Sequence, residues 1–211
     1  MSHIQKGYFI TLEGIEGAGK STHATFIAGL LRQHGHQVLV TREPGGTAFG
    51  EQIRTILLQQ KSLNINAMSE LLLLFAARAQ HVSGIIHPAL AQGKTVICDR
   101  FTDSSVAYQG GGRGIPHEHI NALGNIVHPD LKPDLTLLFD LTAATGLARA
   151  KATAAADRFE SESVEFFTAV RDAYLKMAAA EPGRIKIINA EQDIETVQNE
   201  IRQLINNLDL C

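Results

Sequence analysis

The sequence predicts an α/β fold, a single domain built on a five-stranded parallel β-sheet with helices on both faces. Five short, almost unbroken apolar runs occur along the chain, as expected of strands that are covered on both sides. Longer segments with helical periodicity separate these runs, and such alternation is typical of a parallel sheet. The 211 residues suffice to bury one large core without disulfides.

Each strand is expected where apolar residues follow one another with at most one charge. The predicted strands are residues 8–12, 38–41, 95–98, 135–139 and 185–188. The predicted helices are residues 20–34, 48–59, 68–92, 117–127, 143–151, 163–180 and 194–208. Glycine and proline content predicts loops at residues 44–46 and 110–114. No stretch has the composition of a linker, so we expect one domain over residues 1–211.

Composition excludes several classes of function. The formal net charge is -3, whereas a nucleic-acid-binding domain usually carries a basic excess. The two cysteines, Cys98 and Cys211, form no disulfide framework, and the nine histidines show no metal-ligand spacing. The apolar runs are too short to span a bilayer, and residues 1–7 contain no signal-peptide pattern. We therefore expect a cytoplasmic protein without nucleic-acid or membrane partners.

The strongest functional signal directly follows the first predicted strand. Residues 14–21 read Gly-Ile-Glu-Gly-Ala-Gly-Lys-Ser, the spacing of a P-loop. The glycines let backbone N–H groups point at phosphate oxygens, and the next helix directs its positive end at the same anion. This pattern predicts the P-loop NTPase fold. The predicted ATP-binding residues are Gly14, Ile15, Glu16, Gly17, Ala18, Gly19, Lys20, Ser21 and Thr22.

A P-loop enzyme also needs an acidic residue at the end of a neighbouring strand to hold Mg²⁺. Asp99 and Asp140 each follow a predicted strand. The residues after Asp140 are typical of a helix entry, where a carboxylate serves as a cap. Asp99 is followed at once by Arg100, a side chain suited to phosphate. We therefore predict that Ser21 and Asp99 are the metal-binding pair.

The P-loop does not name a phosphate acceptor. A regulatory GTPase would share it, but the chain lacks an Asn-Lys-x-Asp run for guanine. A hydrolytic ATPase, or a nucleotide-dependent switch acting on a protein partner, stays open as an alternative. Basic and aromatic residues outside the P-loop favour a second nucleotide.

Five segments together resemble the thymidylate kinases over nearly the whole chain. They are residues 12–22, residues 41–47 (Thr-Arg-Glu-Pro-Gly-Gly-Thr), residues 74–78 (Leu-Phe-Ala-Ala-Arg), residues 99–114 with Asp-Arg-Phe and Gln-Gly-Gly-Gly-Arg-Gly, and the pair Asp157-Arg158. The resemblance implies a homodimeric enzyme that transfers the γ-phosphate of ATP to dTMP, giving dTDP by direct in-line transfer. A kinase for another deoxynucleoside monophosphate is the alternative within this class.

The resemblance also implies roles for the acceptor-binding residues. Phe75 is expected to stack on the thymine ring, and Arg78 to donate to thymine O4. Arg54 and Arg100 resemble the clamp on the monophosphate, for which guanidinium forks are well suited. The remaining acceptor residues are Ser105 and Gln109 near N3 and O2 of the base, Tyr108 against the deoxyribose, and Glu16 as an acidic group that holds the clamp arginines or a water on the metal.

One position departs from part of that family. Some thymidylate kinases carry an arginine inside the P-loop, where this chain has Ala18. The catalytic charge is then expected from a lid at about residues 149–160, supplied by Arg149 or Lys151 and in third place by Arg158. Thr153 stands where relatives tend to have a third basic residue. Lys20, Arg100 and Glu16 complete the predicted catalytic set, and Arg42 and Arg113 are the next sources of charge if the lid supplies none.

Overall fold

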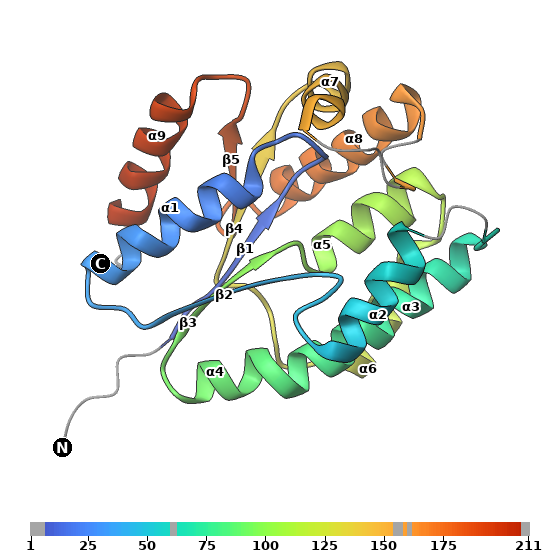
Figure 1. The fold of residues 1–211 in the computed structure, drawn as a ribbon, viewed down its shortest axis with the longest axis horizontal. Coiled ribbons are helices and arrows are strands. Elements are labelled where there is room, and N and C mark those ends of the chain that lie inside the picture. Colours follow the sequence, from blue (N-terminus) through green and yellow to red (C-terminus); the bar gives the residue numbers. More distant parts are fainter. Residues whose placement is uncertain (1–6, 60–62, 154–157, 160–161, 208–211) are drawn as a thin grey trace.

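The computed structural model describes residues 7–59, 63–153, 158–159 and 162–207. Five parallel strands form one sheet in the order β2-β3-β1-β4-β5 (Figure 1). The strands are β1 (Phe9–Glu13), β2 (Val38–Arg42), β3 (Thr95–Asp99), β4 (Leu135–Asp140) and β5 (Ile185–Asn189). The five-stranded parallel sheet predicted from the apolar runs is confirmed.

Helices cover both faces of the sheet. Helix α1 (Lys20–Gln33) and α9 (Ile194–Asn207) lie together on one face, whereas α4 (His87–Ala91) and α8 (Val164–Ala180) pack on the other. The other helices are α2 (Ala48–Leu58), α3 (Ala67–His81), α5 (Thr102–Ser105), α6 (His117–Val127) and α7 (Ala143–Thr153). None of the described helices has the length and apolar character needed to cross a membrane.

Two stretches differ from the sequence-based expectation. The single helix expected over residues 68–92 is helical throughout, but a wide π-type turn, η1 (Val82–Ile86), separates α3 from α4. A second π-type segment, η2 (Val106–Gly112), continues α5 and includes glycines that were expected in a loop. A Cβ on Gly112 would lie 2.4 Å from the Phe166 ring of α8. Close packing of the two helices therefore outweighs the low helix propensity of glycine.

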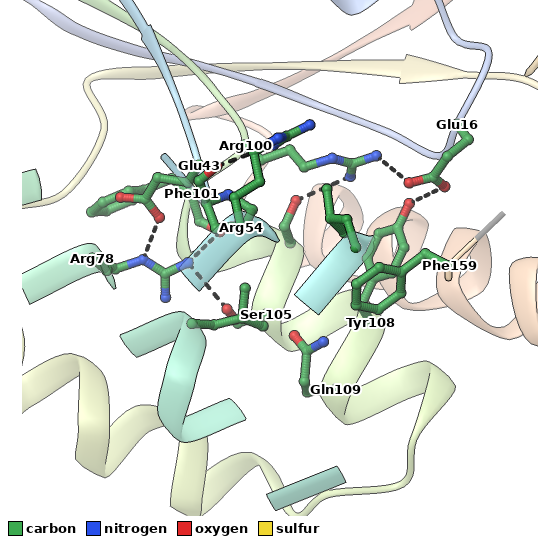
Figure 2. Close-up of a pocket in the computed structure, with 14 residues that line it drawn as sticks. Glu16, Glu43, Arg54, Arg78, Arg100, Phe101, Ser105, Tyr108, Gln109 and Phe159 are labelled. Carbon is green, nitrogen blue, oxygen red and sulfur yellow. Dashed lines mark hydrogen bonds and ion pairs between the residues drawn. The ribbon is translucent and has the colours of Figure 1, made fainter. Parts of the chain in front are cut away.

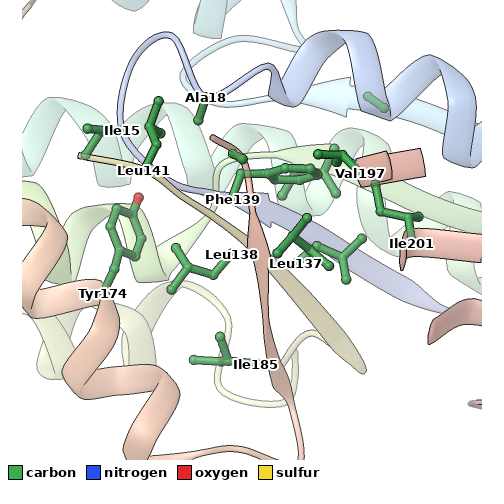
Figure 3. Packing of buried hydrophobic residues seen from close by; sticks show 14 of the residues in the cluster. Ile15, Ala18, Leu137, Leu138, Phe139, Leu141, Tyr174, Ile185, Val197 and Ile201 are labelled. Atoms are coloured by element: carbon green, nitrogen blue, oxygen red, sulfur yellow. The ribbon is translucent and has the colours of Figure 1, made fainter. Parts of the chain in front are cut away.

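The core forms on both sides of the central strands. Leu137 and Phe139 of β4 face Ile201 of α9, whereas Leu138 faces Tyr174 of α8 (Figure 3). All five side chains are at most 2% exposed. This arrangement explains why the strands have no polar face in the sequence.

The carboxyl ends of the strands meet at one edge of the sheet, and there the chain places its charges. Strand β1 ends at Glu13, β3 at Asp99 and β4 at Asp140, while Glu43 directly follows β2. In open parallel sheets, ligands bind outside this edge. The fold thus brings residues that are far apart in sequence to a common site.

Two isoleucines of α9 provide a matched test of the core. Ile201 is fully buried and Ile194 is 60% exposed. We expect Ile201→Ala to lower the free energy of unfolding by about 2–5 kcal/mol, because it removes buried methylene groups and leaves a cavity. Ile194→Ala should change it by less than about 0.5 kcal/mol. Equal losses in urea titrations of the two variants would contradict this packing.

Candidate functional site

The P-loop connects β1 to α1 at the carboxyl edge of the sheet. Gly14, Gly17 and Gly19 have φ angles of 132°, 72° and 81°, a region that favours glycine. A Cβ on Gly17 would lie 2.2 Å from the carbonyl oxygen of Gly146 in α7. The glycines therefore serve both the curl of the loop and its close contact with α7.

Lys20 begins α1 and is only 8% exposed. Its Nζ donates to the carbonyl oxygens of Gly14 at 3.1 Å and Ile15 at 2.8 Å. Burial, with the positive charge of Arg100 nearby, lowers the pKa of Lys20 to about 8. An anion beside this ammonium group would compensate for its burial, which is the setting that a phosphate-binding lysine needs.

Ser21 and Asp99 lie side by side. The Ser21 hydroxyl donates to Asp99 Oδ2 at 3.0 Å, and the buried Oδ1 of Asp99 has no hydrogen-bond partner among the described residues. Asp140, the rejected alternative, makes a two-pronged ion pair with Arg171 at 2.7 and 2.8 Å. A hydroxyl and a carboxylate with an unshared oxygen are suitable ligands for Mg²⁺.

Two cavities adjoin at this edge. The outer cavity is lined by P-loop residues 16–22 together with Asp99, Arg149 and part of the 190–197 segment. Gly14 and Ile15 lie behind it and contribute the carbonyl oxygens that hold Lys20. The inner cavity lies between α2, α3 and the α5–η2 segment (Figure 2). Both cavities share four lining residues, Glu16, Glu43, Arg54 and Arg100.

Arg78 forms the polar end of the inner cavity. Its guanidinium is 2% exposed and donates to Glu43 at 2.7 Å, to the carbonyl oxygen of Phe101 at 3.1 Å and to Ser105 at 3.1 Å. Nη1 is buried and has no hydrogen-bond partner among the described residues. An unpaired buried donor is costly, so this atom points to a ligand acceptor.

Arg100 occupies the border between the cavities. It has a φ of 70°, the only positive value among the described non-glycine residues. Its Nη2 donates to Glu16 at 2.8 Å and its Nη1 to the carbonyl oxygen of Gly14 at 2.9 Å. Glu16 also accepts from the Tyr108 hydroxyl at 2.5 Å. The structure thus brings together the acidic P-loop residue, the clamp arginine and the tyrosine that the sequence predicted.

The other predicted acceptor residues divide into two groups. Arg54, Ser105 and Gln109 line the inner cavity. Phe75, which was expected to stack on the base, is not among the residues that line this cavity: it is 2% exposed and lies under the Arg78 guanidinium. Residues three and four apart on a helix are neighbours, so Phe75 and Leu74 both lie on the Arg78 side of α3, and of the two it is Leu74 that lines the cavity.

Sequence reasoning missed several residues of this region. Phe101, Ser104 and Phe159 also line the inner cavity. Phe101 belongs to the Asp-Arg-Phe segment that the sequence already singled out. Ser104 lies four residues before Tyr108, so a helix predicted over residues 102–112 would have placed the two side chains on one face and indicated Ser104. Phe159 follows the predicted lid in the sequence, and only the fold shows that it reaches this cavity.

Glu13 was also missed, although it precedes the P-loop directly. It is fully buried and accepts hydrogen bonds from the Phe101 backbone at 2.7 Å, Ser104 at 2.6 Å and Tyr174 at 2.8 Å. Burial, and after it the charge of Asp103, raises the pKa of Glu13 to about 7. The carboxyl group thereby ties β1 to the turn that carries Arg100.

The lid candidates do not act as one group. Arg149 Nη1 donates to the carbonyl oxygen of Ala190 at 2.7 Å and lies at the outer cavity. Lys151 is exposed and lines neither cavity. Arg158 turns inward and pairs with Glu70. Asp157 and the side chain of Thr153 lie outside the described residues.

Glu43, His81 and Cys98 lie close enough together to hold a metal ion. However, both ring nitrogens of His81 already have partners, Glu43 at 3.0 Å and Thr41 at 2.7 Å. Glu43 is also paired with Arg78, and burial raises the pKa of the Cys98 thiol. A cluster whose groups are satisfied by each other and by a neighbouring cation is better described as a hydrogen-bond network.

Known proteins are similar to this chain over almost its full length. A family model described as Thymidylate kinase matches residues 12–201. The chain is 54% identical over 202 residues to a thymidylate kinase of Pseudomonas syringae pv. tomato, and 55% identical to one of Pseudomonas fluorescens, with 96% of each chain covered. The crystal structure of thymidylate kinase from Ehrlichia chaffeensis superimposes with a TM-score of 0.78 at 36% identity, covering 95% of this chain and 98% of that one.

The raised pKa of Glu13 predicts a pH dependence of stability. Between pH 4.5, the ordinary pKa of a glutamate side chain, and about pH 7, the folded state retains a proton that the unfolded chain releases. The free energy of unfolding should therefore fall as pH rises through this window, by up to about 3 kcal/mol.

Glu13→Gln removes the titration, so the Tm of the parent minus that of the variant should be larger at pH 5 than at pH 8. Glu200→Gln, a half-exposed residue of α9, is the control, and a constant difference for Glu13→Gln would contradict the burial of a titrating carboxyl group.

Proposed function

The chain belongs to the thymidylate kinase family, and we propose that its inner cavity binds dTMP while its outer cavity binds Mg-ATP. As a member of this family it is a nucleoside monophosphate kinase that phosphorylates dTMP to dTDP with ATP. One observation carries the assignment of the cavities. They meet at Glu16, Glu43, Arg54 and Arg100, so phosphates bound in each would face one another across two guanidinium groups.

In the outer cavity, the P-loop amides and the start of α1 would hold the ATP phosphates. Lys20 would exchange its bonds to backbone carbonyls for the β- and γ-phosphates. Ser21 and Asp99 would hold Mg²⁺, whose chemical contribution is to neutralise charge on the phosphate oxygens. The metal is supported by the unshared oxygen of Asp99.

In the inner cavity, the unpaired Nη1 of Arg78 would donate to thymine O4. A cytosine presents an amino donor at that position, so Arg78 would disfavour it. Arg54 and Arg100 at the border would bind the 5′-phosphate, and Glu16 would keep Arg100 in place. Ser105 would contact the base, and Tyr108 would pack against the deoxyribose.

The reaction on this arrangement is a direct in-line transfer between the two phosphates. The acceptor is already an anion, so no general base is needed, and catalysis rests on positioning and charge neutralisation. Closure of the lid would exclude water and suppress ATP hydrolysis. A hydrolytic ATPase is disfavoured because the inner cavity supplies a second set of cationic and apolar groups beyond the phosphate site.

We also propose a cytoplasmic homodimer. Helices α2, α3 and α6 each carry a large apolar side chain that is exposed to solvent. These are Phe49 at 48%, Leu72 at 50% and Ile126 at 75% exposure. A second copy covering them would remove this surface from water.

A coupled assay of ADP release tests the function. ADP should appear only when ATP and an acceptor are both present, and dTMP should be the best acceptor among all nucleoside monophosphates. ADP release without any acceptor would indicate an ATPase. A better rate with another deoxynucleoside monophosphate would indicate a different kinase.

Lys20→Ala should abolish transfer while leaving the fold intact. The lost interaction acts on the transferring phosphate in a site shielded from water, where electrostatic effects are large. Lys176→Ala, at an exposed position of α8, should keep parental kcat. Near-normal turnover of a folded Lys20→Ala protein would refute the P-loop assignment.

The lid charge should act mainly on the transition state. We expect Arg149→Ala or Lys151→Ala to lower kcat by at least about tenfold, a loss of about 1.4 kcal/mol, with little change in ground-state binding. Arg202→Ala, an exposed arginine of α9, is the matched control. If both lid variants keep the parental kcat at saturating ATP and dTMP, neither side chain supplies the catalytic charge. Arg42, which lines the outer cavity, is then a better candidate than Arg113, which pairs with Glu70 and Glu162.

A further inference from the structure

Glu70 is a buried carboxylate that the proposed reaction does not use. It lies in the first turn of α3 and is 0% exposed. Its Oε1 accepts from Gln109 Nε2 at 2.8 Å and from Arg113 Nε at 3.3 Å, and its Oε2 accepts from Arg158 Nη2 and, at 3.4 Å, from Arg113 Nη2. One carboxylate thus joins three side chains from two segments that border the inner cavity.

The hydrogen bond between Gln109 and Glu70 fixes the orientation of the Gln109 side-chain amide. A carboxylate accepts hydrogen bonds and donates none, so Gln109 must present its NH₂ group to Glu70. A flipped amide would place two oxygens at the observed 2.8 Å. The carbonyl oxygen Oε1 is therefore the end left for the cavity, and it has no hydrogen-bond partner among the described residues. In Figure 2 the Gln109 amide extends towards the other lining residues, with its oxygen on the Ser105 side.

The same carboxylate also holds the segment that follows the lid. Besides its bond to Glu70, Arg158 donates through Nε to the carbonyl oxygen of Leu57 at 2.8 Å, and its backbone N–H donates to that of Leu58 at 3.2 Å. Phe159, the next residue, lines the inner cavity and is 8% exposed. Arg158 is thereby committed to anchoring the wall of the cavity, which explains why it is a poor source of catalytic charge.

We propose that Glu70 is a positioning residue that selects pyrimidines carrying a proton on ring nitrogen N3, because it orients the Gln109 amide with its oxygen towards the base. This inference rests on the proposed binding of dTMP in the inner cavity. Thymine and uracil have an N3–H that Oε1 accepts. Cytosine has an unprotonated N3, so the two acceptors face each other without a proton between them, and such a mismatch weakens binding strongly.

The test is calorimetric measurement of the dissociation constants of dTMP, dUMP and dCMP for the parent and for Glu70→Gln. An amide at position 70 accepts either orientation of Gln109, so the Kd ratio of dCMP to dTMP should fall at least about tenfold. The Kd ratio of dUMP to dTMP should stay within about twofold, because both bases carry N3–H. A merely structural role of Glu70 would weaken all three nucleotides alike, and an unchanged dCMP to dTMP ratio would overturn the proposal.

Two further variants keep the test decisive. Glu162→Gln removes a carboxylate that pairs with Arg113 at 2.7 Å but does not contact Gln109, so both Kd ratios should match those of the parent. Glu70→Asp keeps the charge between the two arginines and withdraws the carboxylate from Gln109; it should lower the dCMP to dTMP ratio even if Glu70→Gln fails to fold. An unchanged ratio in folded Glu70→Asp would overturn the proposal. If the parent binds none of the three nucleotides, the proposed function itself fails, which is a separate result.

Discussion

The site depends on one buried ion pair, between Glu43 after β2 and Arg78 on α3. A guanidinium that is 2% exposed requires a countercharge, and Glu43 supplies it at 2.7 Å while also bonding His81 of the same helix. The pair fixes α3 against the carboxyl edge of the sheet and aims the guanidinium. Burial by itself raises the pKa of Glu43, but the positive charge of Arg78 and the hydrogen bond with His81 outweigh it and hold the pKa below its ordinary value, so the carboxylate stays ionised. Nη1 of Arg78, which has no hydrogen-bond partner among the described residues, is presented to the inner cavity.

The rest of the site repeats this use of acidic residues to hold basic or polar ones. Glu16 holds Arg100 and Tyr108 at the border of the cavities, and Glu13 holds the turn from which Arg100 projects. Glu70 does the same for Gln109 at the far wall. Phosphoryl transfer demands positioning more than covalent chemistry, so such supports for the arginines are a direct physical requirement of the reaction.

Much of this could be predicted from local sequence. Strands buried on both faces leave apolar runs, and the P-loop spacing follows from backbone needs within eight residues, so both were found. The order of the strands, the contacts of η2 and the partner of Arg158 depend on residues far apart in the chain, which no local pattern records. Phe75 is a narrower case: the helical period places both Leu74 and Phe75 beside Arg78, and only the packing of the fold decides that Leu74 lines the cavity while Phe75 lies under the guanidinium. Glu13 and Glu70 look like ordinary acidic residues until the fold buries them.

The most direct test of this account is a crystal structure of the protein with dTMP and a non-hydrolysable ATP analogue. The account predicts the pyrimidine in the inner cavity with O4 within hydrogen-bond distance of Arg78 Nη1 and N3 facing Gln109 Oε1. It also predicts the 5′-phosphate between Arg54 and Arg100, facing the terminal phosphate on the P-loop. A base bound outside the inner cavity, or a 5′-phosphate away from these two arginines, would contradict it.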